Sequence, residues 1–93
     1  MSMGQELLIR EVFRLGGGMT VLACEGATAF STLTGRRARL VVDGHVRQRI
    51  VLAKERSMLN QTTRLNQRAL ETLDSVEVLP EEVHTGRCRL VLE

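Results

Sequence analysis

RRARLVVDGHVRQRIVL, residues Arg36–Leu52, contains two alternating apolar runs that meet at Asp43-Gly44. An Asp-Gly pair between such runs is typical of a β-hairpin with a two-residue type I′ turn. That turn would place Leu40 opposite Arg47, so an apolar side chain would share a face with a charged one. A three-residue loop, with Gly44 in the left-handed conformation of a G1 bulge, removes this conflict. We therefore expect the three-residue loop.

In the expected register the hairpin has one apolar face and one basic face. The inward side chains would be Leu40, Val46, Ala38 and Ile50. The outward side chains would be Arg37, Arg39, Arg47 and Arg49. Like charges on neighbouring strands repel by tenths of a kcal/mol each, so solvent, an acidic neighbour such as Glu11 or Glu55, or an acidic partner has to compensate them. These arginines are our candidate partner-binding residues, and a solvated, internally compensated face is the alternative.

The composition indicates one ordinary globular domain over residues 1–93, with 43% apolar residues and no internal repeat or linker. The net charge of +2 is mild, but Lys54 is the only lysine, so the basic residues are almost all arginine. Arginine offers a planar fork that suits carboxylates and phosphates. A codon bias toward arginine is the alternative explanation.

The N-terminal half is expected to form a hairpin before the central one. Glu6–Phe13 alternates as a strand, with Leu7, Ile9 and Phe13 inward and Glu11 interrupting that side. Gly16-Gly17-Gly18 indicates a turn rather than a phosphate-binding nest, because no helix start and no lysine follow it. Thr20–Cys24 has the composition of the partner strand.

The segments that follow each hairpin are less regular. Glu25–Thr34 is expected to be a loop anchored by Phe30 and Leu33. Within Ser57–Leu73, the strand could continue to residue 59 and then loop. Alternatively, Leu65, Ala69 and Leu73 recur at helical spacing and favour a short helix within residues 64–73.

The C-terminal part ends the pattern with two strands. Val76–Leu79 is expected to be a short strand, and Pro80–Gly86 a turn or a single helical turn. Arg87–Leu92 would be the last strand, with Cys88, Leu90 and Leu92 on one face. About six short strands with glycine-rich turns predict an all-β fold, which we expect to be a small single-domain β-barrel. If that barrel is open, its edge strand would offer a contact for self-association.

The order of these pieces resembles the second-domain β-barrel of translational GTPases such as elongation factor Tu. The first matching elements are Val12-Phe13, Gly16–Gly18, Thr20-Val21, Glu25-Gly26, Thr34-Gly35 and Ala38–Val42. The later ones are Val76–Leu79, Glu81-Glu82, Gly86 and Arg87–Leu92. The resemblance spans nearly the whole chain and implies a barrel.

Two departures separate the chain from that family. No G-x-x-x-x-G-K-[ST] motif occurs, so the GTP-binding domain is missing. Residues 53–73 also lack the family's glycine-marked segment before its late strand. The resemblance therefore implies the fold and not the GTPase or tRNA-delivery activity.

Residues for catalysis or for cofactor and metal binding do not form a recognisable motif. Cys24, His45, His84 and Cys88 lack the spacing of a zinc knuckle. Neither cysteine belongs to a nucleophile motif, and we expect both to be buried and reduced, although a disulfide between them is the alternative. The Glu81-Glu82 pair is explained by solvation in a turn. We expect no metal and no cofactor.

The function expected from these features is non-enzymatic binding. The partner would be a protein with an acidic surface, with the chain acting as an adaptor, a regulator or a toxin-neutralising module. RNA bound through its phosphates is the alternative, but the two phenylalanines give little base stacking. An enzyme with its site in Glu25–Thr34 is the third hypothesis. The sequence has no signal peptide or membrane-length apolar run, so we expect a cytoplasmic protein.

Overall fold

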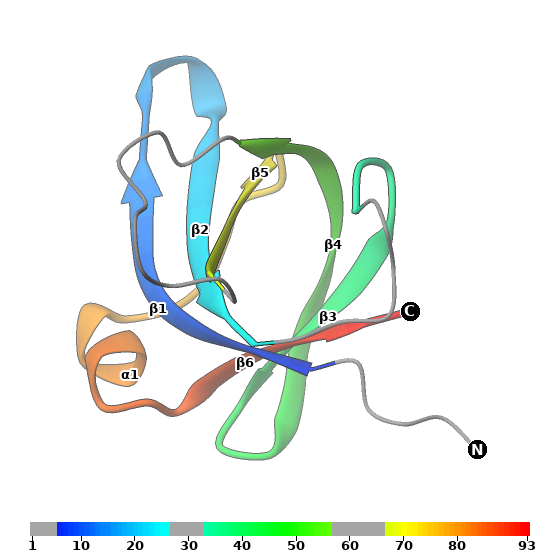
Figure 1. The fold of residues 1–93 in the computed structure, drawn as a ribbon. Helices are drawn as coiled ribbons and strands as arrows, with labels where there is room; N and C mark the ends of the chain where they lie inside the picture. Colours follow the sequence, from blue (N-terminus) through cyan, green and yellow to red (C-terminus); the bar gives the residue numbers. More distant parts are fainter. Residues whose placement is uncertain (1–5, 27–32, 57–66) are drawn as a thin grey trace.

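The computed structural model describes residues 6–26, 33–56 and 67–93. They form six antiparallel strands that close into a barrel in the order β1-β2-β5-β4-β3-β6 (Figure 1). The elements are β1 (Glu6–Arg14), the 3₁₀ turn η1 (Gly16–Gly18), β2 (Thr20–Glu25), β3 (Arg37–Val42), β4 (His45–Arg56), β5 (Gln67–Thr72), α1 (Pro80–His84) and β6 (Cys88–Leu92). The expectation of a small all-β barrel is confirmed.

The ring is closed by pairings between distant parts of the chain. The hairpins β1-β2 and β3-β4 are joined on one side by β5, which lies between β2 and β4, and on the other by β6, which lies between β1 and β3. Each of the six described strands therefore has two neighbours. The ring is closed, so the condition under which an open edge strand would offer a contact for self-association is not met by the described strands.

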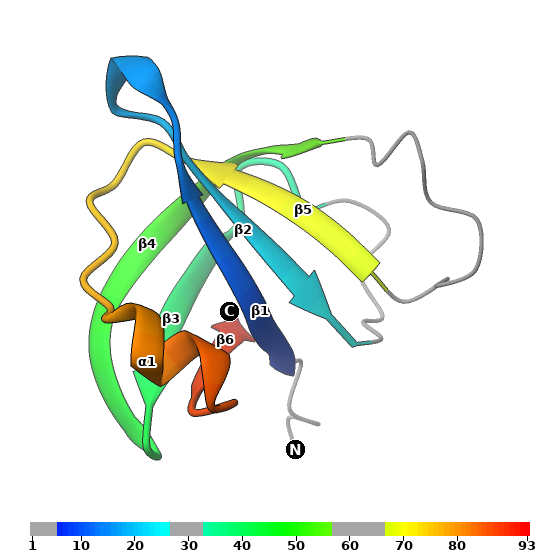
Figure 2. The ribbon, with the colours of Figure 1, turned by 90° about the vertical axis from the view of Figure 1, so that its left-hand side faces the viewer.

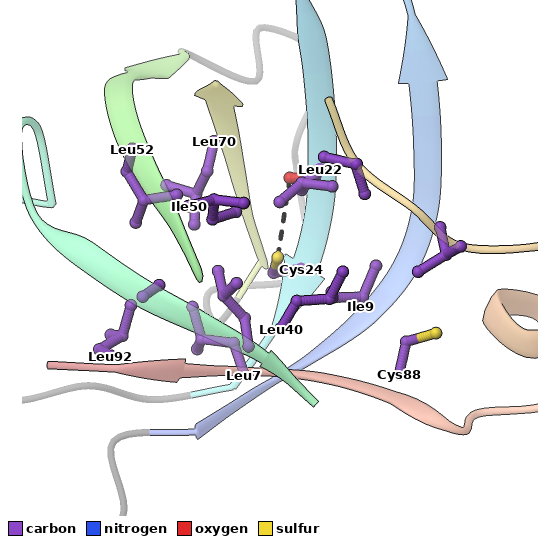
Figure 3. Close-up of a cluster of buried hydrophobic side chains, with 14 of the residues drawn as sticks. Leu7, Ile9, Leu22, Cys24, Leu40, Ile50, Leu52, Leu70, Cys88 and Leu92 are labelled. Carbon is purple, nitrogen blue, oxygen red and sulfur yellow. Dashed lines mark hydrogen bonds between the residues drawn. The ribbon is translucent and has the colours of Figure 1, made fainter. Parts of the chain in front are cut away.

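The core inside the ring is almost entirely aliphatic, as Figure 3 shows. Its largest fully buried side chains are Leu7, Ile9, Leu22, Leu33, Leu40, Ile50, Leu52, Leu70 and Leu90. Cys24 and Cys88 are also buried in it as free thiols, as expected, and the Cys24 Sγ lies 3.7 Å from the Leu22 carbonyl oxygen. Leu33 confirms the expected loop anchor, whereas Phe30 lies outside the described residues.

A β-bulge in β1 explains why Glu11 interrupts the apolar side of that strand. Ile9 pairs with Cys24 but Glu11 pairs with Ala23, so one extra residue lies between them. Such an insertion exchanges the two faces of a strand. Val12 therefore packs against the core, and Phe13 is 49% exposed. The expectation that Phe13 points inward was wrong.

The central hairpin has a two-residue turn, although the separation of its apolar and basic faces had predicted a three-residue loop. Val42 pairs with His45, and Asp43 and Gly44 have φ values of 54° and 82°, as a two-residue type I′ turn requires. The expected three-residue loop is wrong.

The face conflict in this hairpin is removed by a β-bulge instead of a longer loop. The register shifts between Leu40 and Val41, and Arg47 is the extra residue. Beyond the bulge Leu40 pairs with Gln48 and Ala38 with Ile50, as the longer loop would have arranged. Before the bulge the expectation for Val46 was wrong, because this side chain is 52% exposed.

The C-terminal third contains a strand where a helix was expected. Gln67–Thr72 is β5, so the helix within residues 64–73 is wrong there, and residues 57–66 lie outside the described part. Val76–Leu79 is extended but is not a strand, which corrects that expectation too. The helical turn α1 and the buried Cys88, Leu90 and Leu92 of β6 are as expected.

The extended segment 74–79, here called the strap, lies between β5 and α1 (Figure 2). Val76 and Val78 of the strap and Val83 of α1 are buried members of the core cluster. The strap and α1 thus extend the core beyond the six strands. In the described part of the chain, no helix has the length and apolar character that crossing a bilayer requires.

Candidate functional site

Three neighbouring strands, β6, β3 and β4, present arginines on their outer surface. Arg39 of β3 lies opposite Arg49 of β4 on one side and Val91 of β6 on the other. The next outward position of β3, Val41, lies opposite Arg89, and Arg37 lies opposite Val51. We call this surface the arginine face; its basic residues are Arg37, Arg39, Arg49 and Arg89.

The structure brings together three of the four expected arginines and adds one. Arg89 was not among the candidates, although the alternation in Arg87–Leu92 already placed it away from the core. The missing information was which strand lies beside β6. Pairing between β3 and β6 joins residues about fifty apart in the chain, and short sequence patterns do not encode it.

The positive charge of the arginine face is only partly compensated. Glu93 Oε2 lies 3.5 Å from Arg39 Nε and 3.7 Å from Arg49 Nε. Arg37 and Arg89 form no ion pair with any described residue. Within the described ranges, one side-chain carboxylate therefore faces several guanidinium groups, at distances too long for good hydrogen bonds.

The acidic neighbours that the sequence suggested are engaged elsewhere. Glu11 Oε1 lies 3.3 Å from His84 Nε2, and Glu55 Oε1 lies 3.2 Å from Arg68 Nη1. Neither carboxylate neutralises the arginine face. Of the three compensations left open by the sequence, these two acidic neighbours are thus paired with other residues.

Arg47 is separated from the arginine face by the bulge. Its two terminal nitrogens donate to the two carboxylate oxygens of Glu82, at 2.7 and 2.9 Å. Nη1 also donates to the Glu77 carbonyl at 3.1 Å. The bonds from Arg47 and from the Leu79 backbone N–H lower the pKa of Glu82 to about 2. Arg47 thus fastens the strap and α1 to the barrel.

Side chains also explain why the strap is not a strand. Arg14 Nη2 donates to the carbonyls of Val76 and Val78, at 3.1 and 3.5 Å. From the other side, the Gln48 amide donates to the Ser75 carbonyl at 2.8 Å and accepts from the Glu77 N–H at 2.6 Å. These side chains satisfy backbone groups that a neighbouring strand would otherwise pair with.

A second bidentate pair fixes the turn of the central hairpin. Arg87 donates through Nε and Nη2 to the two oxygens of Asp43, at 2.8 and 2.7 Å. This hydrogen bonding holds the pKa of Asp43 below its ordinary value of 3.8. Arg87, beside the start of β6, is therefore structural like Arg47.

Side chains that could take part in catalysis or metal binding are scattered over the molecule. A cavity of about 140 Å³ near α1 is lined by Glu11, Val12, Arg14, Val78, Pro80, Val83 and His84. The His84–Glu11 pair at its rim has no further hydrogen-bonded side chain among the described residues. No group of three or more His, Cys, Asp or Glu in the described ranges could hold a metal ion. Of the loop Glu25–Thr34, residues 27–32 lie outside the description.

Comparison with known proteins adds no relative. No protein-family model matches the chain, and neither the curated proteins nor the solved structures gave a match.

Proposed function

We propose that the chain is a small non-enzymatic binding module that recognises an acidic macromolecule, with a protein as partner, through the arginine face. The observation that supports this is the charge imbalance of that face. It has four arginines on three adjacent strands, and among the described residues Glu93 supplies the one side-chain carboxylate within 4 Å of any of them. Carboxylates of a partner would complete the ion pairs that Glu93 leaves incomplete.

A protein partner is favoured over RNA by the composition of the face. The three strands β3, β4 and β6 contain no Phe, Tyr or Trp on which a base could stack. RNA would have to bind through its phosphates alone. It is the partner to consider if the resemblance to translation-factor barrels reflects common function. We place the module in the cytoplasm, where the free thiols Cys24 and Cys88 stay reduced.

The first prediction concerns charge reversal on the arginine face. We expect a labelled poly-glutamate peptide to bind at low salt and to weaken as salt rises, because the attraction is between exposed charges. Arg49→Glu should weaken binding about tenfold, since this side chain is 76% exposed and held only by Glu93 at 3.7 Å. Fluorescence anisotropy measures both effects.

The control variant is Arg10→Glu. Arg10 is also exposed, lies on β1 and pairs with Glu25 at 3.5 Å, and its reversal changes the net charge equally. It should leave the peptide affinity within about twofold, because the effect is local to the arginine face. Equal losses in the two variants would contradict the proposal. A mixed-sequence single-stranded RNA that binds more tightly than the peptide, and loses affinity with Arg49→Glu, would replace the protein partner by RNA.

A further inference from the structure

The outward side chains between the arginines of the arginine face are valines. Val41 and Val46 lie opposite each other on β3 and β4, Val51 lies opposite Arg37, and Val91 lies opposite Arg39. Val46 and Val51 are 52% and 47% exposed, while Val41 and Val91 are half-buried. Apolar and cationic side chains are therefore mixed over the same three strands.

The mixture of valines and arginines bears on the chemistry of the partner. A surface that only attracts charge gains nothing from exposed valines, whereas water leaves them readily when an apolar side chain covers them. Phosphates and carboxylates alone cannot cover them. Among the described residues, α1 and the strap are fastened near Arg14, Arg47 and Gln48. The strap also reaches the backbone of Val51, whose N–H donates to Asp74 Oδ2 at 2.7 Å, but the Val51 side chain stays 47% exposed.

We infer that the occupant of the arginine face is an acidic polypeptide segment in which aliphatic side chains alternate with carboxylates. Its carboxylates would pair with Arg37, Arg39, Arg49 and Arg89, and its aliphatic groups would cover Val46 and Val51. This inference rests on the proposed function and narrows its partner. It also predicts that some of the binding free energy persists at high salt, because ions screen the attraction between charges but not the burial of apolar surface.

Two short labelled peptides of equal length and charge test this inference, one alternating Glu with Val and the other Glu with Ser. We expect the Glu-Val peptide to bind about tenfold more tightly, a gain typical of covering two half-exposed valines. The gain should persist as salt weakens both peptides. It should shrink in the variants Val46→Ser and Val51→Ser.

The control variant is Leu15→Ser, which removes a 42% exposed apolar side chain in the connection between β1 and β2, two strands that do not belong to the arginine face. It should leave the ratio of the two affinities unchanged, and circular dichroism should show that all variants fold. Equal binding of both peptides, still dependent on Arg49, would overturn the inference and leave the proposed function standing. A Glu-Val advantage that survives both valine substitutions would also overturn it. Failure of both peptides to bind at low salt would overturn the proposed function itself.

Discussion

Arg47 and Arg49 are separated by one residue and have different environments. Arg49 is largely exposed, whereas Arg47 is bidentate to a carboxylate whose residue is only 7% exposed. In the sequence both belong to the same run of alternating residues, so both were predicted to line one basic face. The bulge at Arg47 and the approach of α1 separate them. Neither feature has a local signature, because Glu82 lies 35 residues away in the chain.

The Arg47–Glu82 pair makes stability depend on pH. Its hydrogen bonds lower the pKa of Glu82 from the ordinary 4.5 to about 2 in the folded chain, so the unfolded chain binds the proton more readily between those values. The stabilisation is therefore complete above about pH 4.5 and is lost as pH falls toward 2. We expect the urea midpoint to fall across this range.

The variant Glu82→Gln distinguishes the contribution of the Arg47–Glu82 pair to the pH dependence of stability from the contributions of other acidic groups. It should lower the urea midpoint at neutral pH, because Arg47 loses a charged partner. It should also flatten the acid dependence, leaving the contribution of Asp43, whose pKa is likewise lowered by its arginine. Parallel midpoint curves for the variant and the natural chain across acidic pH would contradict this assignment.

At the scale of the element, the central hairpin shows how far the sequence could be interpreted. The Asp-Gly signal was correct for the turn, and the need to separate apolar from basic faces was correct for the strands beyond it. A two-residue turn and separated faces are compatible because a β-bulge follows the first pairs beyond the turn, and the sequence carries no local signal for that bulge. The strand β5 was missed for a different reason. Ala69 and Leu73 keep helical spacing, but pairing with β2 and β4 outweighs that local preference.

The type I′ turn makes Gly44 sensitive to substitution. Its φ of 82° lies in the left-handed region, and a Cβ there would meet no atom within 4 Å, so the cost of Gly44→Ala is conformational alone. We expect a loss of about 1 kcal/mol in the free energy of unfolding. Gly16→Ala is the matched control, because Gly16 is equally open and has no positive φ. Urea unfolding of both variants checks the difference; equal effects would show that the turn is not under this constraint.

At the scale of the whole molecule, closure of the barrel depends on contacts that no short pattern contains. Leu7 lies opposite Leu90, and Ala38 opposite Leu92, so β6 joins the beginning and the middle of the chain. The number of strands agreed with the prediction only because the expected strand Val76–Leu79 was wrong and β5 was missed. The inward set of β6 could be predicted from alternation. The neighbours of β6, and with them the membership of Arg89 in the arginine face, could not.

The closed ring also protects both thiols. Burial raises the pKa of Cys24 to about 12 and that of Cys88 above its ordinary value, and the thiolate is the reactive form. We expect the variant Cys88→Ala, which retains only Cys24, to react with a thiol reagent solely through unfolding. Its labelling rate should then rise with urea in parallel with the unfolded fraction. Rapid labelling in native buffer, independent of urea, would contradict a closed barrel around Cys24.

The backbone of the strap is fixed by side chains from distant parts of the chain. Ser75 and Glu77 offer mainly their peptide groups to Gln48 and Arg47, so the identity of these two exposed residues matters little to the contacts. The identities that matter belong to Arg14, Arg47 and Gln48. The exposed positions of the strap should therefore accept substitutions with little loss of stability. Substitutions of the distant residues that hold the strap should destabilise it.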